Sequence, residues 1–209
     1  KIKKIYGKTH NLEFEYDAMG HRISKIIIPL DIDEKEDLSI RVITHYVNDA
    51  DGNILSTYSH NYSGGETLFQ TNNIYGSSRL GIYASDVDLM STPDPVLLNQ
   101  RRSSRQLGLK EYEFSNHLGN VLTTISDRRQ IAGTEFLAEI RTAQDYYPFG
   151  MIMPGRQLNP ENYRFGYGGN ECDNEIKGNG NLLAFGGYEY DTRLGRRLNL
   201  DPASIKYPS

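Results

Sequence analysis

Residues 16–23, Tyr16-Asp17-Ala18-Met19-Gly20-His21-Arg22-Ile23, predict the fold of the chain. An aromatic residue begins the stretch, a short polar turn with a glycine follows, and an aliphatic residue ends it. Aromatic and β-branched side chains favour strands, whereas Asx residues and glycine favour tight turns with positive φ. The stretch therefore predicts a β-hairpin, in which Tyr16 closes one strand and Ile23 opens the next.

The same pattern returns three times along the chain. It recurs as Tyr46–Ile54, Phe114–Val121 and Tyr190–Leu198. Flanking segments such as Asn11–Tyr16 and Leu38–Val42 are apolar at every second position, as strands are. Spaced copies of one hairpin predict an all-β fold, a continuous array of antiparallel β-hairpins with almost no helix. An antiparallel sandwich with ordinary turns would produce the same local signals.

Four segments depart from this rhythm. Residues 31–37 are acidic and predict a solvated hairpin tip. Residues 85–106 contain two prolines and a Ser/Arg cluster, and predict a long irregular connection. Residues 135–142 fit a strand or a helix, and the alternation of apolar side chains favours a strand. Asp201-Pro202 has the form of a helix N-cap followed by proline, which predicts a single helical turn.

The composition excludes several classes of protein. The 209 residues include 15 Tyr and 20 Gly but no Trp, and a chain this rich in aromatics is not disordered. The net charge of -4 is dispersed, which argues against a nucleic-acid partner because such a partner requires a basic face. No apolar run is long enough for a membrane span. The first residues lack a signal peptide's apolar stretch, and we interpret the chain as a fragment of a longer protein.

A set of motifs, in this order, resembles the core of the Rhs or YD-repeat family. The hairpin stretch at residues 16–22 resembles the YD repeat itself. The further matching segments are Ile74–Gly81, Asn116–Val121, Tyr146–Met151, Tyr163–Gly166, Asp173–Gly178, Tyr190–Arg196 and Asp201-Pro202. The chain departs from the family pattern at Arg197, where an aromatic is usual, and at residues 168–172.

The resemblance implies a β-ribbon wound into part of a hollow shell. It divides the chain into YD-repeat hairpins at 1–84, an irregular connection at 85–106, and a repeat-associated core region at 107–209. In the bacterial toxin-type members, the shell holds a C-terminal polypeptide. Other members are secreted or cell-surface adhesion proteins without a toxin. The implied partners are the remainder of the same chain, an encapsulated C-terminal polypeptide, and export machinery or surface proteins.

The sequence contains no recognisable catalytic, cofactor or metal site. The five histidines lack metal-ligand spacing, and His21 and His117 are expected in solvated turns. The resemblance implies that the family's self-cleaving aspartyl site includes a second Asp-Pro motif followed by glycine, which lies further along the core than Ser209, where this sequence stops. Asp191 and Asp201 are the carboxylates that could belong to such a site. The alternative roles are structural: a turn residue for Asp191 and a helix cap for Asp201. We therefore expect no enzyme activity.

Three smaller features have structural interpretations. Cys172 is expected to be an incidental thiol in a Gly/Asn-rich loop. Asn61-Tyr62-Ser63 matches a glycosylation acceptor, which is a weak signal at three residues. The many tyrosines are expected to pack in cross-strand pairs rather than to form a binding surface. Finally, Tyr6 and the strand near Leu12 are expected to pair with chain further upstream, which would leave a sticky sheet edge in the isolated fragment.

Overall fold

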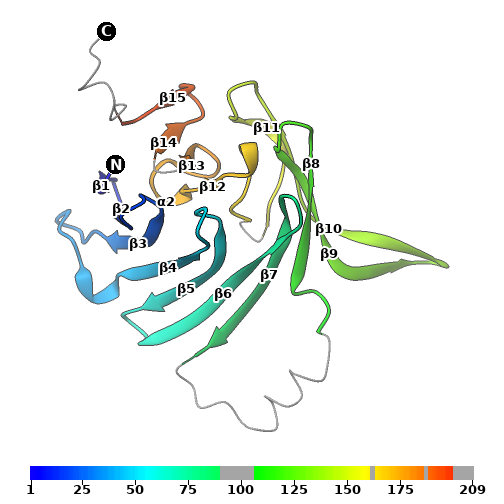
Figure 1. The fold of residues 1–209 in the computed structure, drawn as a ribbon, viewed down its shortest axis with the longest axis horizontal. Coiled ribbons are helices and arrows are strands. Elements are labelled where there is room, and N and C mark those ends of the chain that lie inside the picture. Colours follow the sequence, from blue (N-terminus) through cyan, green and yellow to red (C-terminus); the bar gives the residue numbers. More distant parts are fainter. Residues whose placement is uncertain (90–105, 161–162, 186–187, 200–209) are drawn as a thin grey trace.

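The structure, a computed structural model, describes residues 1–89, 106–160, 163–185 and 188–199. Eleven antiparallel strands form one sheet in chain order, and among the described residues β1 does not pair with β11, so the sheet is open. Figure 1 shows that this sheet is strongly curved. The strands are β1 (Lys4–Tyr6), β2 (His10–Tyr16), β3 (Arg22–Pro29), β4 (Val42–Asn48), β5 (Ile54–Asn61), β6 (Glu66–Tyr75), β7 (Arg79–Asp88), β8 (Lys110–Ser115), β9 (Val121–Ala132), β10 (Glu135–Tyr146) and β11 (Ile152–Leu158).

A second, four-stranded sheet follows β11. It contains β12 (Glu171–Cys172), β13 (Leu182–Phe185), β14 (Tyr188–Asp191) and β15 (Arg196–Arg197). The described helical turns are η1 (Leu38–Ile40), η2 (Tyr167–Gly169) and α2 (Asn174–Lys177). We call the described residues of 163–199 the closing segment, because they lie within the curve of the large sheet (Figure 1). The all-β antiparallel prediction is confirmed, but the prediction of one continuous array is wrong, since this segment leaves the first sheet.

All four copies of the quoted pattern form hairpins. They connect β2 to β3, β4 to β5, β8 to β9, and β14 to β15. In the first copy, the carboxylate of Asp17 accepts a hydrogen bond from the backbone N–H of His21, and Gly20 has a φ of 91°. An L-residue rarely adopts that conformation, so the glycine is what allows the turn. The hairpin prediction is therefore confirmed.

The predicted strand at Leu38–Val42 is wrong for residues 38–41, and β4 begins only at Val42. Asp37 accepts hydrogen bonds from the backbone N–H and hydroxyl of Ser39, and this local capping holds Leu38–Ile40 in a 3-10 turn. Leu38 and Ile40 are exposed, so burial gives the apolar alternation no advantage here. The acidic run before it is confirmed as a hairpin tip, because Leu30 bridges Glu36 across the turn.

Two other predicted boundaries can be compared with the structure. Strand β7 runs to Asp88, so the irregular connection does not begin at residue 85. Because β7 pairs with β6 over this stretch, ladder hydrogen bonds extend the strand into the polar sequence. The strand at 135–142 is confirmed as part of β10. The expected turn at Asp201-Pro202 lies outside the described residues. The large sheet crosses the proposed boundary at residue 107, and that three-part division stays a prediction.

The core lies between the inner face of the large sheet and the closing segment. Ile82 and Val121 from the sheet pack with Tyr163 and Phe165 from the closing segment. At the other end of the sheet, Leu12 is fully buried and pairs with Ile5 of β1. The expectation that the strand near Leu12 lacks its neighbour is therefore wrong, because the chain folds back to supply β1. The edge strand is β1 itself.

Candidate functional site

Asp191 has the structural surroundings that the turn interpretation expects. One carboxylate oxygen accepts hydrogen bonds from the backbone N–H groups of Arg193 and Leu194. The other lies 2.7 Å from the ammonium of Lys177 and 3.0 Å from the guanidinium of Arg193. Although burial raises the pKa of Asp191, these hydrogen bonds and charges lower it well below its ordinary value. Asp201, the other carboxylate considered, lies outside the described residues.

Cys172 is not in a loop, as the sequence suggested. It lies in β12, pairs with Leu183, and is 5% exposed. Burial raises the pKa of its thiol to about 12, so the thiolate is disfavoured at neutral pH. The glycine-rich composition around it predicted a loop, but those glycines form the η2 turn just before the strand.

The histidines and the glycosylation motif stay apart from any cluster. His117 is exposed in its hairpin turn, as expected. His21 is half-buried instead, because its ring lies so close to Gly52 of the next hairpin that a Cβ there would overlap it. Asn61 accepts hydrogen bonds from the backbone N–H and the hydroxyl of Ser63. No group of metal-binding side chains occurs within the residues that the structure describes.

The main polar site is a buried charge cluster between the large sheet and the closing segment. Its members share a position at that interface: Arg22, Lys25, Arg164, Glu171, Asp173, Glu175 and Glu189. Strand β3 supplies the first two, and the closing segment supplies the other five. The sheet thus contributes two cations, while the closing segment contributes four carboxylates and one guanidinium. Charge complementarity therefore holds the two parts together.

Lys25 and Asp173 form the centre of this cluster. The Lys25 ammonium lies 3.0 Å from the Asp173 carboxylate and 3.4 Å from that of Glu175. Both Lys25 and Asp173 are almost completely buried, at 1% and 0% exposed. Burial and Arg164 lower the pKa of Lys25, but Tyr46, Asp173 and Glu171 raise it by more, so the pKa lies above its ordinary value and the ammonium stays charged. An ion this deep requires such partners, because desolvation alone costs several kcal/mol.

Arg22 joins two carboxylates that lie side by side. Its guanidinium is 3.1 Å from Asp173 and 2.7 Å from Glu189. Burial raises the pKa of Glu189 to about 8, and the neighbouring Asp173 adds to that rise against the effect of Arg22. For Asp173, burial again raises the pKa, but Arg22, Lys25 and Arg164 lower it below its ordinary value. The pKa of Glu189 is therefore raised, while that of Asp173 is lowered.

Two further contacts complete the cluster. The guanidinium of Arg164 lies 2.7 Å from Glu175, and it donates a hydrogen bond to the carbonyl of Cys172. The hydroxyl of Tyr46, on β4, donates to Glu171 at 3.2 Å. Residues from β3, β4, β12, α2 and β14 therefore meet at one point, although they are far apart in the sequence.

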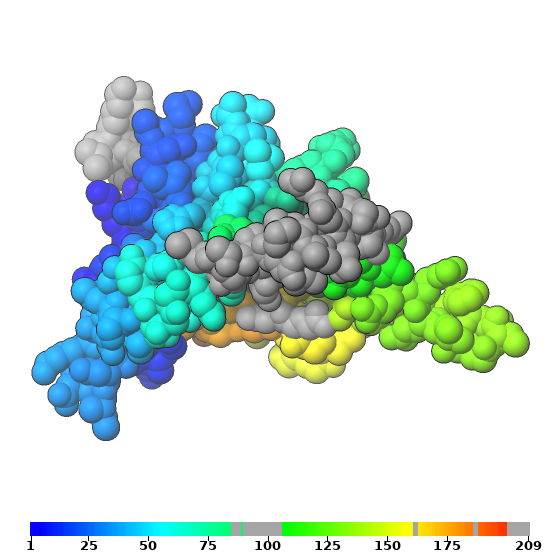
Figure 2. All heavy atoms as spheres, turned by 90° about the horizontal axis from the view of Figure 1, so that it is seen from below, coloured from blue at the N-terminus to red at the C-terminus, as the bar shows by residue number. Residues whose placement is uncertain are grey.

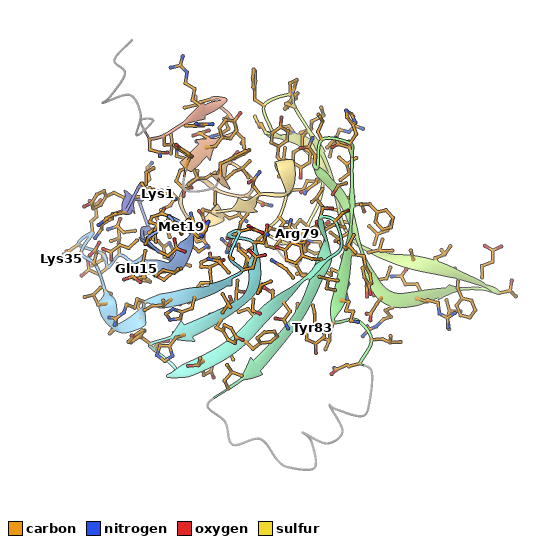
Figure 3. The ribbon with its side chains drawn as sticks, in the orientation of Figure 1. Lys1, Glu15, Met19, Lys35, Arg79 and Tyr83 are labelled. Carbon is orange, nitrogen blue, oxygen red and sulfur yellow. The ribbon has the colours of Figure 1, made fainter. Side chains whose placement is uncertain are left out.

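A second anchor lies beside the first, around Arg79 of β7. Its guanidinium lies 3.6 Å from the ring centre of Phe165 and donates a hydrogen bond to the carbonyl of Gly169. It also pairs with Glu113 at 2.9 Å, and Tyr163 donates to the same carboxylate at 2.5 Å. Figure 3 shows Arg79 on the inner side of the sheet, among the side chains of this interface.

A partly open cavity of about 460 Å³ lies between the two anchors. Its walls come from β3 to β8 on one side and from Tyr163–Phe165 and Glu171 on the other. The lining mixes threonines and a glutamine with apolar side chains, and Lys25, Tyr46 and Arg164 reach it.

Sequence reasoning missed both anchors. Lys25 precedes three isoleucines, where a strand pattern predicts burial, and an unexplained buried cation was a usable signal. The carboxylates of Glu171, Asp173 and Glu175 alternate along the closing segment, which was a second signal. Nothing local, however, indicates that these two segments meet.

Comparisons with known proteins identify a related fold, but they do not show to which family the chain belongs. No family model matches the chain. Salivary gland surface protein 1 of Aedes aegypti is 25% identical over 200 residues, which cover 95% of this chain and 5% of that protein. The crystal structure of TcdB2-TccC3-TEV is similar over 98% of this chain and 8% of that one, with 16% identity and a TM-score of 0.50. The chain of TcdB2-TccC3-Cdc42 gives a TM-score of 0.49 with 15% identity, over 92% of this chain and 9% of that one.

These similarities concern the fold and only a small part of each of the three proteins. At 16% identity, the similarity to TcdB2-TccC3-TEV is one of fold, and it shows a related antiparallel β-architecture. This chain spans less than a tenth of each of the three proteins. Within the described residues, no helix is long and apolar enough to cross a membrane.

Proposed function

We propose that residues 1–209 are a wall and seal segment of a secreted Rhs-type shell, which encloses or presents a C-terminal polypeptide. The observation that carries the proposal is the buried charge cluster. It fastens the closing segment across the inner face of an open, curved sheet, so that the interior is covered at this end. A seal requires this kind of fixed, buried attachment rather than a solvated and mobile one.

Several other observations support this function. The sheet has β1 and β11 as its edges, so further strands of a longer chain could continue the wall. The fold likeness to TcdB2-TccC3-TEV covers nearly all of this chain but 8% of that one, as a wall segment would. The polar lining of the cavity suits a surface that borders a chain loosely, without a specific pocket.

We also propose that this part of the protein is not an enzyme. Asp191 is committed to a turn and to two cations, so its carboxylate has no free lone pair for proton transfer. The raised pKa of Glu189 arises inside the anchor, where its partners hold the closing segment in place. Perturbed carboxylates occur in structural ion networks as well as in active sites.

The second candidate is a secreted or surface-displayed interaction protein without a toxin. The relative from Aedes aegypti favours it, because that protein is named a surface protein and matches 95% of this chain. In this case the same β-array would be the displayed surface, and nothing would be enclosed.

One experiment separates the two candidates. The full-length protein, carrying an epitope tag at its extreme C-terminus, is treated with proteinase K under native conditions. The shell function predicts that the tag survives in the wild type and is digested in Arg22→Met, in which the seal is weakened. Lys35→Met is the matched control, since Lys35 pairs with Asp33 on the exposed tip. Digestion of the wild-type tag at the rate of denatured protein would refute the shell and favour display.

A further inference from the structure

The buried charge cluster contains one more carboxyl group than cations. Within the described residues, three cations meet four carboxyl groups: Arg22, Lys25 and Arg164 face Glu171, Asp173, Glu175 and Glu189. If all seven groups were ionised, the attached closing segment would bury one negative charge without a counterpart. A buried acid avoids this cost by keeping its proton, because burial disfavours the charged form. The attached state therefore favours the uptake of one proton.

Asp173 and Glu189 share one nitrogen of the same guanidinium. Nη2 of Arg22 donates to both, at 3.1 Å from Asp173 and 2.7 Å from Glu189. Asp173 also pairs with Lys25, whereas Arg22 is the one cation that pairs with Glu189 in the described part of the chain. Oε2 of Glu189 is buried and has no hydrogen-bond partner among the described residues. A proton on Glu189 removes the charge from this unsatisfied oxygen, and two carboxyl groups on one cation do not readily ionise together.

The surroundings of Glu189 come from the elements packed around β14. The groups that face it are Tyr16 of β2, Arg22 of β3, Glu171 of β12, and Asp173 between β12 and α2. Lys25 and Arg164 pair with Asp173 instead. Burial is the main cause that raises the pKa of Glu189, Asp173 adds to the rise, and Arg22 opposes it.

The two strands beside β14 add little to this balance of charges. Strand β13, which pairs with β14, carries no titratable side chain. On β15, Arg196 is exposed, and the guanidinium of Arg197 lies over the ring of Tyr188. The protonation of Glu189 is therefore governed by the interface with the large sheet.

Detachment of the closing segment would return Glu189 to water. Its pKa there is the ordinary 4.5, against about 8 in the attached state. Between these values detachment releases a proton, so the ratio of detached to attached protein rises by up to about tenfold per pH unit. Below about 4.5 both states hold the proton, and the attachment has its full strength.

We propose that the closing segment is attached to the large sheet in a proton-dependent way, with Asp173 and Glu189 as the proton-binding pair. The attachment is tight in mildly acidic surroundings and weakens toward mildly alkaline ones. This inference rests on the proposed function, in which the closing segment is the seal, and it gives that seal a means of release. Transfer to less acidic surroundings favours opening without cleavage of the chain.

Cys172 reports detachment, because it lies in β12 beside Asp173 and is 5% exposed. The full-length protein is treated with dithiodipyridine, a thiol reagent that also reacts in mild acid, at pH values from 5.5 to 8. Mass spectrometry of the peptides measures the labelling rate at Cys172. Division by the rate of a synthetic peptide of residues 168–176 at the same pH removes the pH dependence of the thiol itself. The quotient measures the detached fraction.

Two added cysteines calibrate the reagent. Thr134→Cys lies at the tip of residues 129–138, which are all exposed and project from the rest of the molecule (Figure 2), so it should react at the peptide rate at every pH. Ser24→Cys lies in β3 at a position that is 1% exposed. Because neighbouring residues of a strand alternate, it is on the opposite face from Lys25 and reports opening of the large sheet itself.

We expect the quotient for Cys172 to rise at least tenfold between pH 5.5 and 8, and that for Ser24→Cys to stay at least tenfold lower at pH 8. Glu189→Gln has the same shape but cannot ionise, so its quotient for Cys172 should change less than twofold. Asp33→Asn, on the exposed tip, is the matched control and should keep the wild-type slope.

Four results would overturn the proposal: a wild-type quotient that does not change with pH, a slope that Glu189→Gln retains, labelling of Ser24→Cys as fast as that of Cys172, or labelling of Cys172 at the peptide rate at every pH in Glu189→Gln. Failure of the shell function is seen separately, with the tagged protein. Digestion of the C-terminal tag at pH 5.5, while Cys172 stays protected, would refute the shell and leave the proton-dependent attachment in place.

Discussion

At the scale of single residues, Lys25 is a buried cation at the centre of the interface. It is 1% exposed and faces the carboxylates of Asp173 and Glu175 at 3.0 and 3.4 Å. A buried ion pair is no proof of net stability, since desolvation offsets the attraction. Removing one partner is different, because the remaining charges stay buried without compensation. The cluster therefore specifies where the closing segment docks.

We predict that Lys25→Met lowers the free energy of unfolding by about 3–5 kcal/mol, the usual cost of leaving a buried charge unpaired. Urea denaturation followed by circular dichroism provides the measurement. Lys35→Met serves as control and should leave the midpoint almost unchanged, because the Lys35–Asp33 pair is solvent-exposed. Equal midpoints for the wild type and Lys25→Met would contradict the assigned role of the cluster.

Glu189 makes stability depend on pH. Its pKa is about 8 in the folded protein, because of burial and then Asp173, against 4.5 for an ordinary glutamate. Between these values the unfolded state loses a proton that the folded state keeps, so stability falls as pH rises from about 4.5 to about 8. The slope is at most about 1.4 kcal/mol per pH unit.

The pH prediction is checked by urea denaturation at intervals from pH 5 to 8.5. Glu189→Gln keeps the shape of the side chain but cannot ionise. The free energy of unfolding of this variant should therefore depend less on pH than that of the wild type over the same pH range. Asp173 affects stability in a different pH range. Its pKa is lowered in the folded protein, so the stability that it contributes is lost as pH falls through and below about 3.8. A wild-type slope that survives in Glu189→Gln would show that another group is responsible.

At the scale of elements, the contact between β7 and β8 depends on a glycine. A Cβ at Gly81 would lie 2.0 Å from the backbone carbonyl of Glu111, on the neighbouring strand. The sheet cannot give way by that much without separating the two strands. Gly65, in the turn between β5 and β6, has a φ of 67° and nothing within 4 Å of a Cβ. Only backbone conformation constrains that position.

We therefore expect Gly81→Ala to be far more harmful than Gly65→Ala. The turn variant should cost about 1 kcal/mol, the usual penalty for an L-residue in a left-handed conformation. The strand variant should cost more than 3 kcal/mol, because it disrupts pairing as well. Thermal unfolding by calorimetry compares the two directly. Similar losses in both would mean that β7 and β8 can move apart easily.

At the scale of the whole molecule, the two anchors should make the closing segment as stable as the wall. The charge cluster fixes β12 and β14 to β3, and Arg79 fixes Phe165 and Gly169 to β7. Residues 129–138, the outer parts of β9 and β10, are by contrast all exposed. The closing segment should therefore be locally more stable than residues 129–138.

Hydrogen exchange with mass spectrometry tests this ranking. Amides of β12 and β13 should exchange as slowly as those of β4 to β6, whereas residues 129–138 should exchange within seconds to minutes. Arg79→Leu should accelerate exchange around Phe165 and leave the exchange of residues 129–138 unchanged. Fast exchange of β12 and β13 in the wild type would count against a fixed seal.

Much of the fold could be predicted from local pattern. The four hairpins, the acidic tip and the strand at 135–142 depend on near neighbours in sequence, through turn chemistry and alternation. The strand prediction for Leu38–Val42 was wrong at residues 38–41, because an equally local effect, the cap by Asp37, competes with the alternation of apolar residues. The assignment of Cys172 to a loop failed because β12 is a two-residue strand after a glycine turn.

By itself, the sequence determined that this chain forms antiparallel hairpins, because aromatic residues, Asx turns and glycine act over a few residues. Only the tertiary structure decided that the last hairpin leaves the first sheet and returns to its inner face. That decision depends on Arg22 and Lys25 meeting carboxylates about 150 residues later in the chain. Charges so far apart in sequence have no local pattern, since their partners are specified by burial and distance in the folded molecule.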